Sequence, residues 1–321
     1  MRRFSAVAAL LLLALAFPGY AQRYPDRALR LVVPDTGGGT LDVPARILAE
    51  EMRQVLGQPV LVENKPGAGG ILAADSVAKS RPDGYSYLFI PASTETIVPF
   101  LYSKLPYDYR KDLIPVTQVA TIPLVVFVPA SSSIASLKDL TDYAKLRDGK
   151  MAAGAYGPGS LGHFSYELLK SRIGLNAIFV PYKGGQQLYG DLLAGNLDIL
   201  VDTLAGADPF IRSGRIKPLF ITSSSRSPLA PNIPTVAESG VPGFGLMGWV
   251  GVMAPAETSR AHIAAFQAAA AKALQDTKVR ERMAQFSYEA TGTSPEALAE
   301  IIRADRERYS ALVKTLGLRA D

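Results

Sequence analysis

Cysteine is absent from the 321-residue sequence, and histidine occurs only at His163 and His262. The absence of thiols excludes disulfides, thiolate zinc sites, cysteine nucleophiles and a lipid-anchored cysteine. Two histidines do not favour a histidine-based metal centre either. We therefore expect no metal and no cofactor.

Long apolar runs are also scarce. The run at residues 6–17 is shorter than the roughly 18–20 residues that a membrane-spanning helix needs, and no later run is long enough. Two arginines precede it, and the small residues Gly19 and Ala21 follow it. This pattern is typical of a secretory signal peptide over residues 1–21, cut after Ala21, and predicts a soluble, exported mature protein.

A strong excess of one charge is lacking as well. The formal net charge of +5 falls to +3 when the two arginines of the signal peptide are removed, and no cluster of lysine and arginine stands out. The sequence therefore carries no footprint of nucleic-acid binding. A hydrophobic content of 48% predicts a globular protein with a substantial core. The length of 321 residues is enough for one large domain or two of ordinary size.

The stretch of residues 29–56 organises the first part of the chain. An apolar run at 29–34 predicts a buried strand, and apolar residues near helical spacing over 42–56 predict a helix. The glycine-rich turn between them brings free N–H groups and a helix N-terminus toward an anion. A P-loop is excluded, since G-x-x-x-x-G-K-[S/T] does not occur. If this turn binds a ligand, the candidate residues are Thr36, Gly38, Gly39 and Thr40. The alternative interpretation is a tight turn that binds no ligand.

Two more strands, at 60–64 and 85–90 around a short helix at 71–79, complete a βαβαβ unit and predict a parallel sheet. Right-handed crossovers place the ends of its first and third strands at one edge. Ser93 and Thr94, which follow the third strand, should then face the same crevice as the first loop. Their hydroxyls suit carboxylate oxygens, while capping of the next helix is an equally good interpretation.

A second α/β unit begins near residue 123. Residues 226–244, rich in Pro, Ser and Gly, predict a long surface connection. We expect the last strand and three terminal helices to return to the first unit. The predicted strands are 124–128, 150–155, 177–181, 197–201, 217–222 and 246–253, and the terminal helices are 259–274, 277–286 and 295–316.

This order predicts two lobes. Lobe 1 would comprise residues 22–122 and 246–321, and lobe 2 residues 123–245. The two chain crossings between them would form a hinge.

Residues 157–162 spell a literal G-x-G-x-x-G between a predicted strand and a predicted helix. A dinucleotide site also needs an acid about 20 residues later, where the sequence has Tyr182 and Lys183. Pro158 also fits poorly inside that turn. We favour a second anion-binding loop that faces the crevice from the other lobe.

Ser160, His163 and Asp202 raise the question of a serine hydrolase. G-x-S-x-G is absent, and Ser160 fits a helix N-cap better, so we do not favour it. His163 can instead donate to a bound carboxylate, or be an ordinary polar residue at a helix start. Asp202 and Thr203 end an apolar strand, where Asp202 either accepts from a ligand or caps the next helix. We count all four as candidate ligand-binding residues.

Asp35 lies inside the first glycine-rich turn. A carboxylate there would repel an anionic ligand. Either the ligand carries a neutral or positive group at that point, or Asp35 points away from it.

Taken in order along essentially the whole mature chain, the motifs resemble the Bug family, the periplasmic substrate-binding subunits of tripartite tricarboxylate transporters. The ordered set is specific, although no single motif decides. The residues that carry the resemblance are 24–26, 38–42, 45–46, 62–70, 82–85, 105–108, 157–160, His163, 180–185, 192–195 and 234–240.

The resemblance implies a two-lobed α/β protein of the Venus-flytrap, type II-like class, with mixed, mostly parallel sheets and flanking helices. It implies a periplasmic receptor, expected as a monomer, that captures a small carboxylate: a di- or tricarboxylate, an amino acid or an aromatic acid. The implied partners are the membrane subunits of a tripartite transporter or a sensor protein.

The family holds its ligand carboxylate with the first βα loop and the loop after the third strand. The resemblance carries these roles over onto residues 38–40 and onto Ser93 and Thr94, with Ser160 and Asp202 contributing from the second lobe. Asp35 and Gly37 depart from the family, which usually has an aromatic residue and a proline there, so ligand preference can differ.

Two other classes compete with a binding protein. One is an exported α/β enzyme that acts on a small organic acid in the same cleft, and the other is an interaction protein that no longer binds a ligand. The sequence favours binding, because it lacks a credible nucleophile–base pair, metal cluster or cofactor fingerprint.

Overall fold

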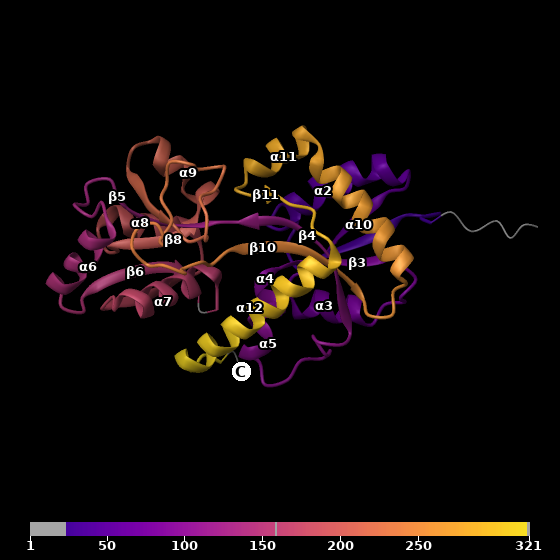
Figure 1. Ribbon diagram of the computed structural model, residues 1–321, viewed down its shortest axis with the longest axis horizontal. Helices are drawn as coiled ribbons and strands as arrows, with labels where there is room; N and C mark the ends of the chain where they lie inside the picture. The colour runs from indigo at the N-terminus through magenta and orange to yellow at the C-terminus, as the bar shows by residue number, and fades with distance from the viewer. Residues whose placement is uncertain (1–23, 158, 320–321) are drawn as a thin grey trace, which may run out of the picture.

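The computed structural model describes residues 24–157 and 159–319, which form two sheets with flanking helices (Figure 1). The predicted signal peptide, residues 1–21, lies outside them. None of the helices described is both long and apolar enough to span a bilayer.

The first sheet has the strand order β11-β4-β10-β3-β1-β2. Successive side chains of a strand point to opposite faces, and each face carries its own core. Leu31 packs beneath α2 and α10, whereas Val32 packs against α3 and the start of α12. The elements of this part are β1 (Leu29–Val33), α2 (Asp42–Leu56), β2 (Val60–Asn64), η1 (Ala68–Gly70), α3 (Ile71–Ala78), β3 (Ser86–Pro91), α4 (Ala92–Thr96), α5 (Val98–Leu101), β4 (Leu113–Ile122), β10 (Gly248–Pro255), α10 (Arg260–Gln275), α11 (Thr277–Ala284), β11 (Glu289–Ala290) and α12 (Pro295–Leu316).

The second sheet has the order β7-β6-β8-β5-β9. Helices α6 and α7 cover one face of it, around Val126 and Phe164, and α8 and α9 cover the other, around Phe127 and Leu188. Its elements are β5 (Leu124–Pro129), α6 (Leu137–Leu146), β6 (Met151–Tyr156), α7 (Leu161–Ile173), β7 (Ala177–Tyr182), α8 (Gly185–Ala194), β8 (Ile199–Thr203), α9 (Leu204–Arg212) and β9 (Ile216–Ile221).

The two-lobed α/β fold with mixed sheets is confirmed, but parallel pairing is less extensive than expected. Strand β1 pairs in parallel with β2 and β3, and β6 with β7 and β8, whereas the pairs that involve β4, β5 or β10 are antiparallel. The reason is geometric: β5 and β10, the first strands after the chain passes from one sheet to the other, run against the βαβ strands of their sheets. Strand β4 runs in the direction of β1 and β3 but pairs with β10 and β11, which run opposite to it.

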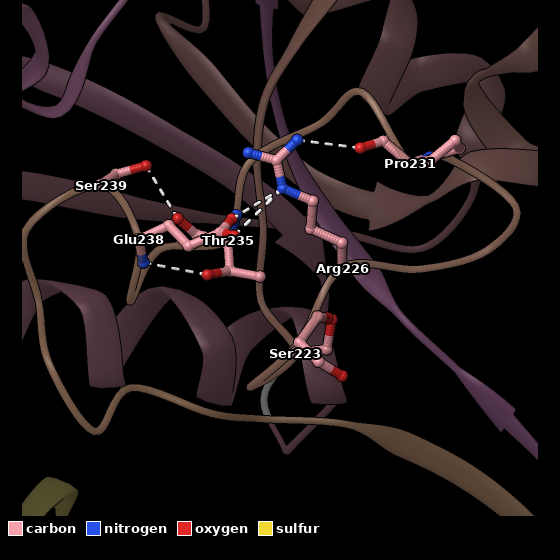
Figure 2. Close-up of polar contacts among 7 residues, drawn as sticks. Ser223, Arg226, Pro231, Thr235, Glu238 and Ser239 are labelled. Carbon is pink, nitrogen blue, oxygen red and sulfur yellow. Dashed lines mark hydrogen bonds and ion pairs between the residues drawn. The ribbon is translucent and has the colours of Figure 1, made fainter.

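The connection after β9 is more ordered than a surface loop. Figure 2 shows its polar contacts: Arg226 Nε donates to the Glu238 carboxylate, and Arg226 Nη1 donates to the Pro231 carbonyl. Thr235 and Glu238 exchange two hydrogen bonds, since each backbone N–H donates to the other's side chain, as in a capping box. The apolar residues Val236, Val241 and Phe244 are buried in the core of the second lobe. Leu246, which was predicted to begin the last strand of lobe 1, also packs there, and β10 begins two residues later.

The terminal helices also differ from expectation. Helices α10 and α11 pack on the first sheet as predicted, but α12 extends across to the second lobe (Figure 1). Leu298 and Ile302 lie in the core of lobe 1, while Tyr309 and Val313 lie in the core of lobe 2. The Tyr309 ring meets Phe164 of α7 edge-on, 5.4 Å between centroids. A helix of 22 residues is long enough to contact both lobes.

An ion pair between Arg306 and Glu95 fixes α12 to α4. Glu95 is fully buried, and Arg306 also donates to the carbonyls of Glu95 and Tyr109, at 3.1 and 2.7 Å. Burial raises the pKa of Glu95, and the Arg306 guanidinium opposes that rise.

We predict that Arg306→Ala lowers the free energy of unfolding by about 3–5 kcal/mol, because it leaves a buried carboxylate without its partner. Urea denaturation measures the change. Arg303→Ala is the matched control on the same helix, since its ion pair with Glu300 is exposed and solvent screens it. Equal effects of the two substitutions would contradict the assignment.

Candidate functional site

A cavity of about 630 Å³ lies between the two lobes. Lobe 1 contributes the loop after β1 and the segment between α11 and β11. Lobe 2 contributes the ends of β6 and β8 and the first turns of α7 and α9. The lining residues are Thr40, Leu41, Ile122, Leu124, Tyr156, Ser160, Leu161, Gly162, Val201, Asp202, Thr203, Ala205, Gly206, Phe286 and Tyr288.

Asp42 organises the loop after β1. Its carboxylate, 2% exposed, accepts from Gly38 N at 2.7 Å, Arg46 Nε at 2.7 Å and Asn64 Nδ2 at 2.8 Å. Burial alone would raise the pKa of Asp42, but the hydrogen bonds from Arg46, Gly38 and Asn64 outweigh it and hold the pKa below its ordinary value. These hydrogen bonds hold the loop in the conformation that brings Thr40 and Leu41 to the cavity.

Asp35 turns its carboxylate back onto the same loop. Oδ1 accepts from Thr36 N and Oδ2 from Leu41 N, both at 2.8 Å. Of the four predicted residues here, Thr40 lines the cavity, and its carbonyl accepts from Tyr288 Oη at 2.8 Å. Thr36, Gly38 and Gly39 lie outside the lining, and Gly38 adjoins a separate hollow beside Arg46.

Ser93 and Thr94 do not meet this cavity. The residues after β3 form the short helix α4 rather than a loop. Thr94 is buried and donates its hydroxyl to the Gly69 carbonyl at 3.0 Å, so its side chain serves the loop after β2. Ser93 is half-buried on α4.

Ser160 lines the cavity as the N-cap of α7. Its Oγ accepts from His163 N and donates to the Tyr156 carbonyl, at 3.1 and 2.7 Å. His163 is 4% exposed and lies outside the lining. Its Nδ1 accepts from Gly159 N at 3.2 Å, and its ring stacks on Phe179. The ring of His163 is thus engaged with its own loop and not with the Ser160 hydroxyl.

Asp202 and Thr203 line the cavity at the end of β8. Asp202 Oδ2 accepts from Tyr189 Oη at 2.7 Å and Tyr156 Oη at 3.4 Å, and Oδ1 accepts from Thr203 N at 2.7 Å. Burial raises the pKa of Asp202, and it also raises the pKa of Tyr156 to about 12. Thr203 caps α9 by accepting from Gly206 N. These contacts position the Tyr156 hydroxyl and the start of α9.

Two residues join the lobes beside the cavity. Ser287 Oγ accepts from Ala205 N, in the first turn of α9, at 2.6 Å. Ser227 of the connection after β9 donates to the Glu289 carboxylate of β11. In the part of the chain that the structure describes, no group of three or more His, Asp or Glu residues gathers as a metal ion would require.

The family model for the tripartite tricarboxylate transporter family receptor, TctC, matches residues 44–318 of this chain. The chain belongs to this family. It is a receptor of the solute-binding type, with the two-lobed fold described above.

Sequence and structure comparisons with individual relatives support this membership. The receptor is 35% identical to Protein BugT of Bordetella pertussis over 304 residues, which covers 94% of this chain and 93% of BugT. It resembles the solved periplasmic binding protein BugD (34% identity, TM-score 0.74, covering 92% and 99% of the two chains). It also resembles the structure of Rpa4515 of R. palustris with adipate (32% identity, TM-score 0.78, covering 92% and 99%).

Sequence reasoning missed much of the receptor's cavity wall. Leu41, Leu124 and Leu161 look like ordinary core residues in the sequence, and Phe286 and Tyr288 lie far from every glycine-rich loop. Tyr156 carried a usable signal, since it lies between the strand predicted at 150–155 and the 157–162 motif. The other aromatic residues had none.

His163 predicts a pH dependence of stability. Burial, and next the nearby Lys170 charge, lower the pKa of His163 from 6.5 to about 4. Between these values the unfolded chain binds a proton that the folded chain does not, so His163 lowers the free energy of unfolding as the pH falls from about 6.5 to 4. Urea denaturation at several pH values should show a shallower decline for His163→Asn than for the unchanged receptor. An identical decline would refute this assignment.

Proposed function

We propose that the receptor captures a small carboxylate in the cavity between its lobes and delivers it to the membrane subunits of a tripartite tricarboxylate transporter. The observation that carries the proposal is the cavity itself. It brings together the ends of three strand–helix units, marked by Thr40, Ser160 and Thr203. Hydroxyls and helix N-termini favour anionic groups.

The lobes would move relative to each other. We propose residues 22–122 with 246–321 as one lobe and 123–245 as the other, with the ligand shifting the population toward the closed form. The contacts Ser287–Ala205 and Ser227–Glu289 bridge the lobes and fit such a closed form. A membrane subunit of the transporter would bind this closed form. A sensor protein is the other partner that we consider.

We further propose that the receptor works in the periplasm as a monomer, after removal of residues 1–21. The solved relative BugD is described as a periplasmic binding protein. The predicted signal peptide is consistent with export.

An enzyme in the same cleft is the competing function. It would need a nucleophile activated by a base. The Ser160 hydroxyl donates to a carbonyl, and the His163 ring nitrogen Nδ1 accepts from Gly159 N. These bonds favour a role in fixing the start of α7, and we propose that the receptor is not an enzyme.

A panel of acids tests the function. At 100 times its dissociation constant, the ligand should raise the free energy of unfolding by about 2.7 kcal/mol. Thermal shift of the purified protein, refolded to remove carried ligand, measures this gain. Turnover of the stabilising compound would support the enzyme instead.

The position of the site is tested by a matched pair of hydroxyl deletions. Thr40→Ala should weaken binding of the stabilising acid roughly three- to tenfold, the effect of one hydrogen bond. Ser93→Ala should leave the affinity unchanged, since α4 lies outside the cavity lining. Isothermal titration calorimetry gives both affinities, and the opposite pattern would move the site to the end of β3.

A further inference from the structure

The loop after β1 is already occupied by carboxylates of its own chain. Asp35 accepts from Thr36 N and Leu41 N, and Asp42 accepts from Gly38 N. Leu41 is the N-cap of α2, and Thr36 and Gly38 lie in the turn before it. Free N–H groups in such a place favour a ligand anion. These N–H groups therefore already donate to carboxylates of the same loop and its helix.

Gly39 makes this arrangement possible. A Cβ atom at residue 39 would collide with the Asp35 carboxylate, so only glycine leaves room for the acid to fold over the loop. The position of the Asp35 carboxylate therefore depends on the absence of a side chain at Gly39.

The wall of the neighbouring cavity is largely apolar. Leu41, Ile122, Leu124, Leu161, Val201 and Phe286 line it, and the described lining contains no lysine, arginine or histidine. Its one acidic residue, Asp202, already accepts three hydrogen bonds from lobe 2. A second charged group of a ligand would find no cationic partner in this wall, and burying an unpaired charge is costly.

We infer that Asp35 determines specificity: it takes the place of a second ligand carboxylate, so that the receptor selects acids with one carboxylate and an apolar body. The inference rests on the proposed function and narrows its ligand class. A dicarboxylate would place its second carboxylate beside Leu41, whose N–H already donates to Asp35, or against the rest of the apolar wall. Like charges at close range repel, and an unpaired carboxylate loses its hydration without compensation.

Matched acids test the inference. Isothermal titration calorimetry on the refolded protein would compare hexanoate with adipate and benzoate with terephthalate. Adipate has a carboxylate in place of the terminal methyl group of hexanoate, and terephthalate has one in place of the para hydrogen of benzoate. The monocarboxylate should bind at least about tenfold more tightly in at least one pair.

Two variants then link the preference to Asp35. Asp35→Ala frees Thr36 N and Leu41 N, and should reduce the preference for the monocarboxylate at least about tenfold. Asp35→Asn, which keeps the size but removes the charge, should reduce it in the same direction. Glu257→Ala, which removes an exposed acid outside the cavity, is the control and should leave the preference unchanged.

The outcomes separate the inference from the function on which it rests. Tighter binding of the dicarboxylates by the unchanged protein, or a preference that neither Asp35 variant alters, overturns the role of Asp35 and leaves carboxylate binding intact. Failure of all four acids to bind, when the wider panel does contain a stabilising acid, overturns the role of Asp35 alone. Failure of the whole panel overturns both.

Discussion

The carboxylates of Asp35 and Asp42 hold the loop after β1 through hydrogen bonds from its backbone N–H groups. The geometry of the cleft on the side of lobe 1 depends on these bonds. Asp42 is buried among Gly38 N, Arg46 and Asn64, so it fixes the glycine-rich turn, the start of α2 and the end of β2 together. A buried carboxylate is tolerated only when donors surround it. Thr40 and Leu41 consequently reach the cavity at defined positions, and Tyr288 can donate to the Thr40 carbonyl.

The relation between the lobes rests on a different interaction. Helix α12 begins on the first sheet, is fixed there by Arg306 and Glu95, and ends against α7 of the other lobe. The two chain crossings are therefore accompanied by a third connection through side-chain packing. The bonds of Ser287 and Ser227 also connect the lobes, close to the cavity residues Ala205 and Tyr288.

Much of the fold could be predicted from periodicity alone. The helix predicted over residues 42–56 coincides with α2, and the three terminal helices lie within one or two residues of their predicted bounds. The site was less predictable. Thr94 follows a strand as a ligand-binding residue would, yet its hydroxyl bonds to the Gly69 carbonyl. Asp202 ends its strand at the cavity as expected, but Tyr189, Tyr156 and Thr203 N already occupy its oxygens.

The sequence by itself determined the two α/β units, their order and the family, because hydrophobic periodicity, glycine turns and ordered motifs are local properties of the chain. Only the tertiary structure decided which carboxylates are free and which residues face the cavity. From the sequence, Asp35 is an acidic residue in a turn whose side-chain direction is unknown. The structure shows that its carboxylate accepts from Thr36 N and Leu41 N. Leu41, Leu161 and Phe286 become a ligand-sized wall only when two lobes meet, since a cavity surface and a core surface are built from the same apolar residues.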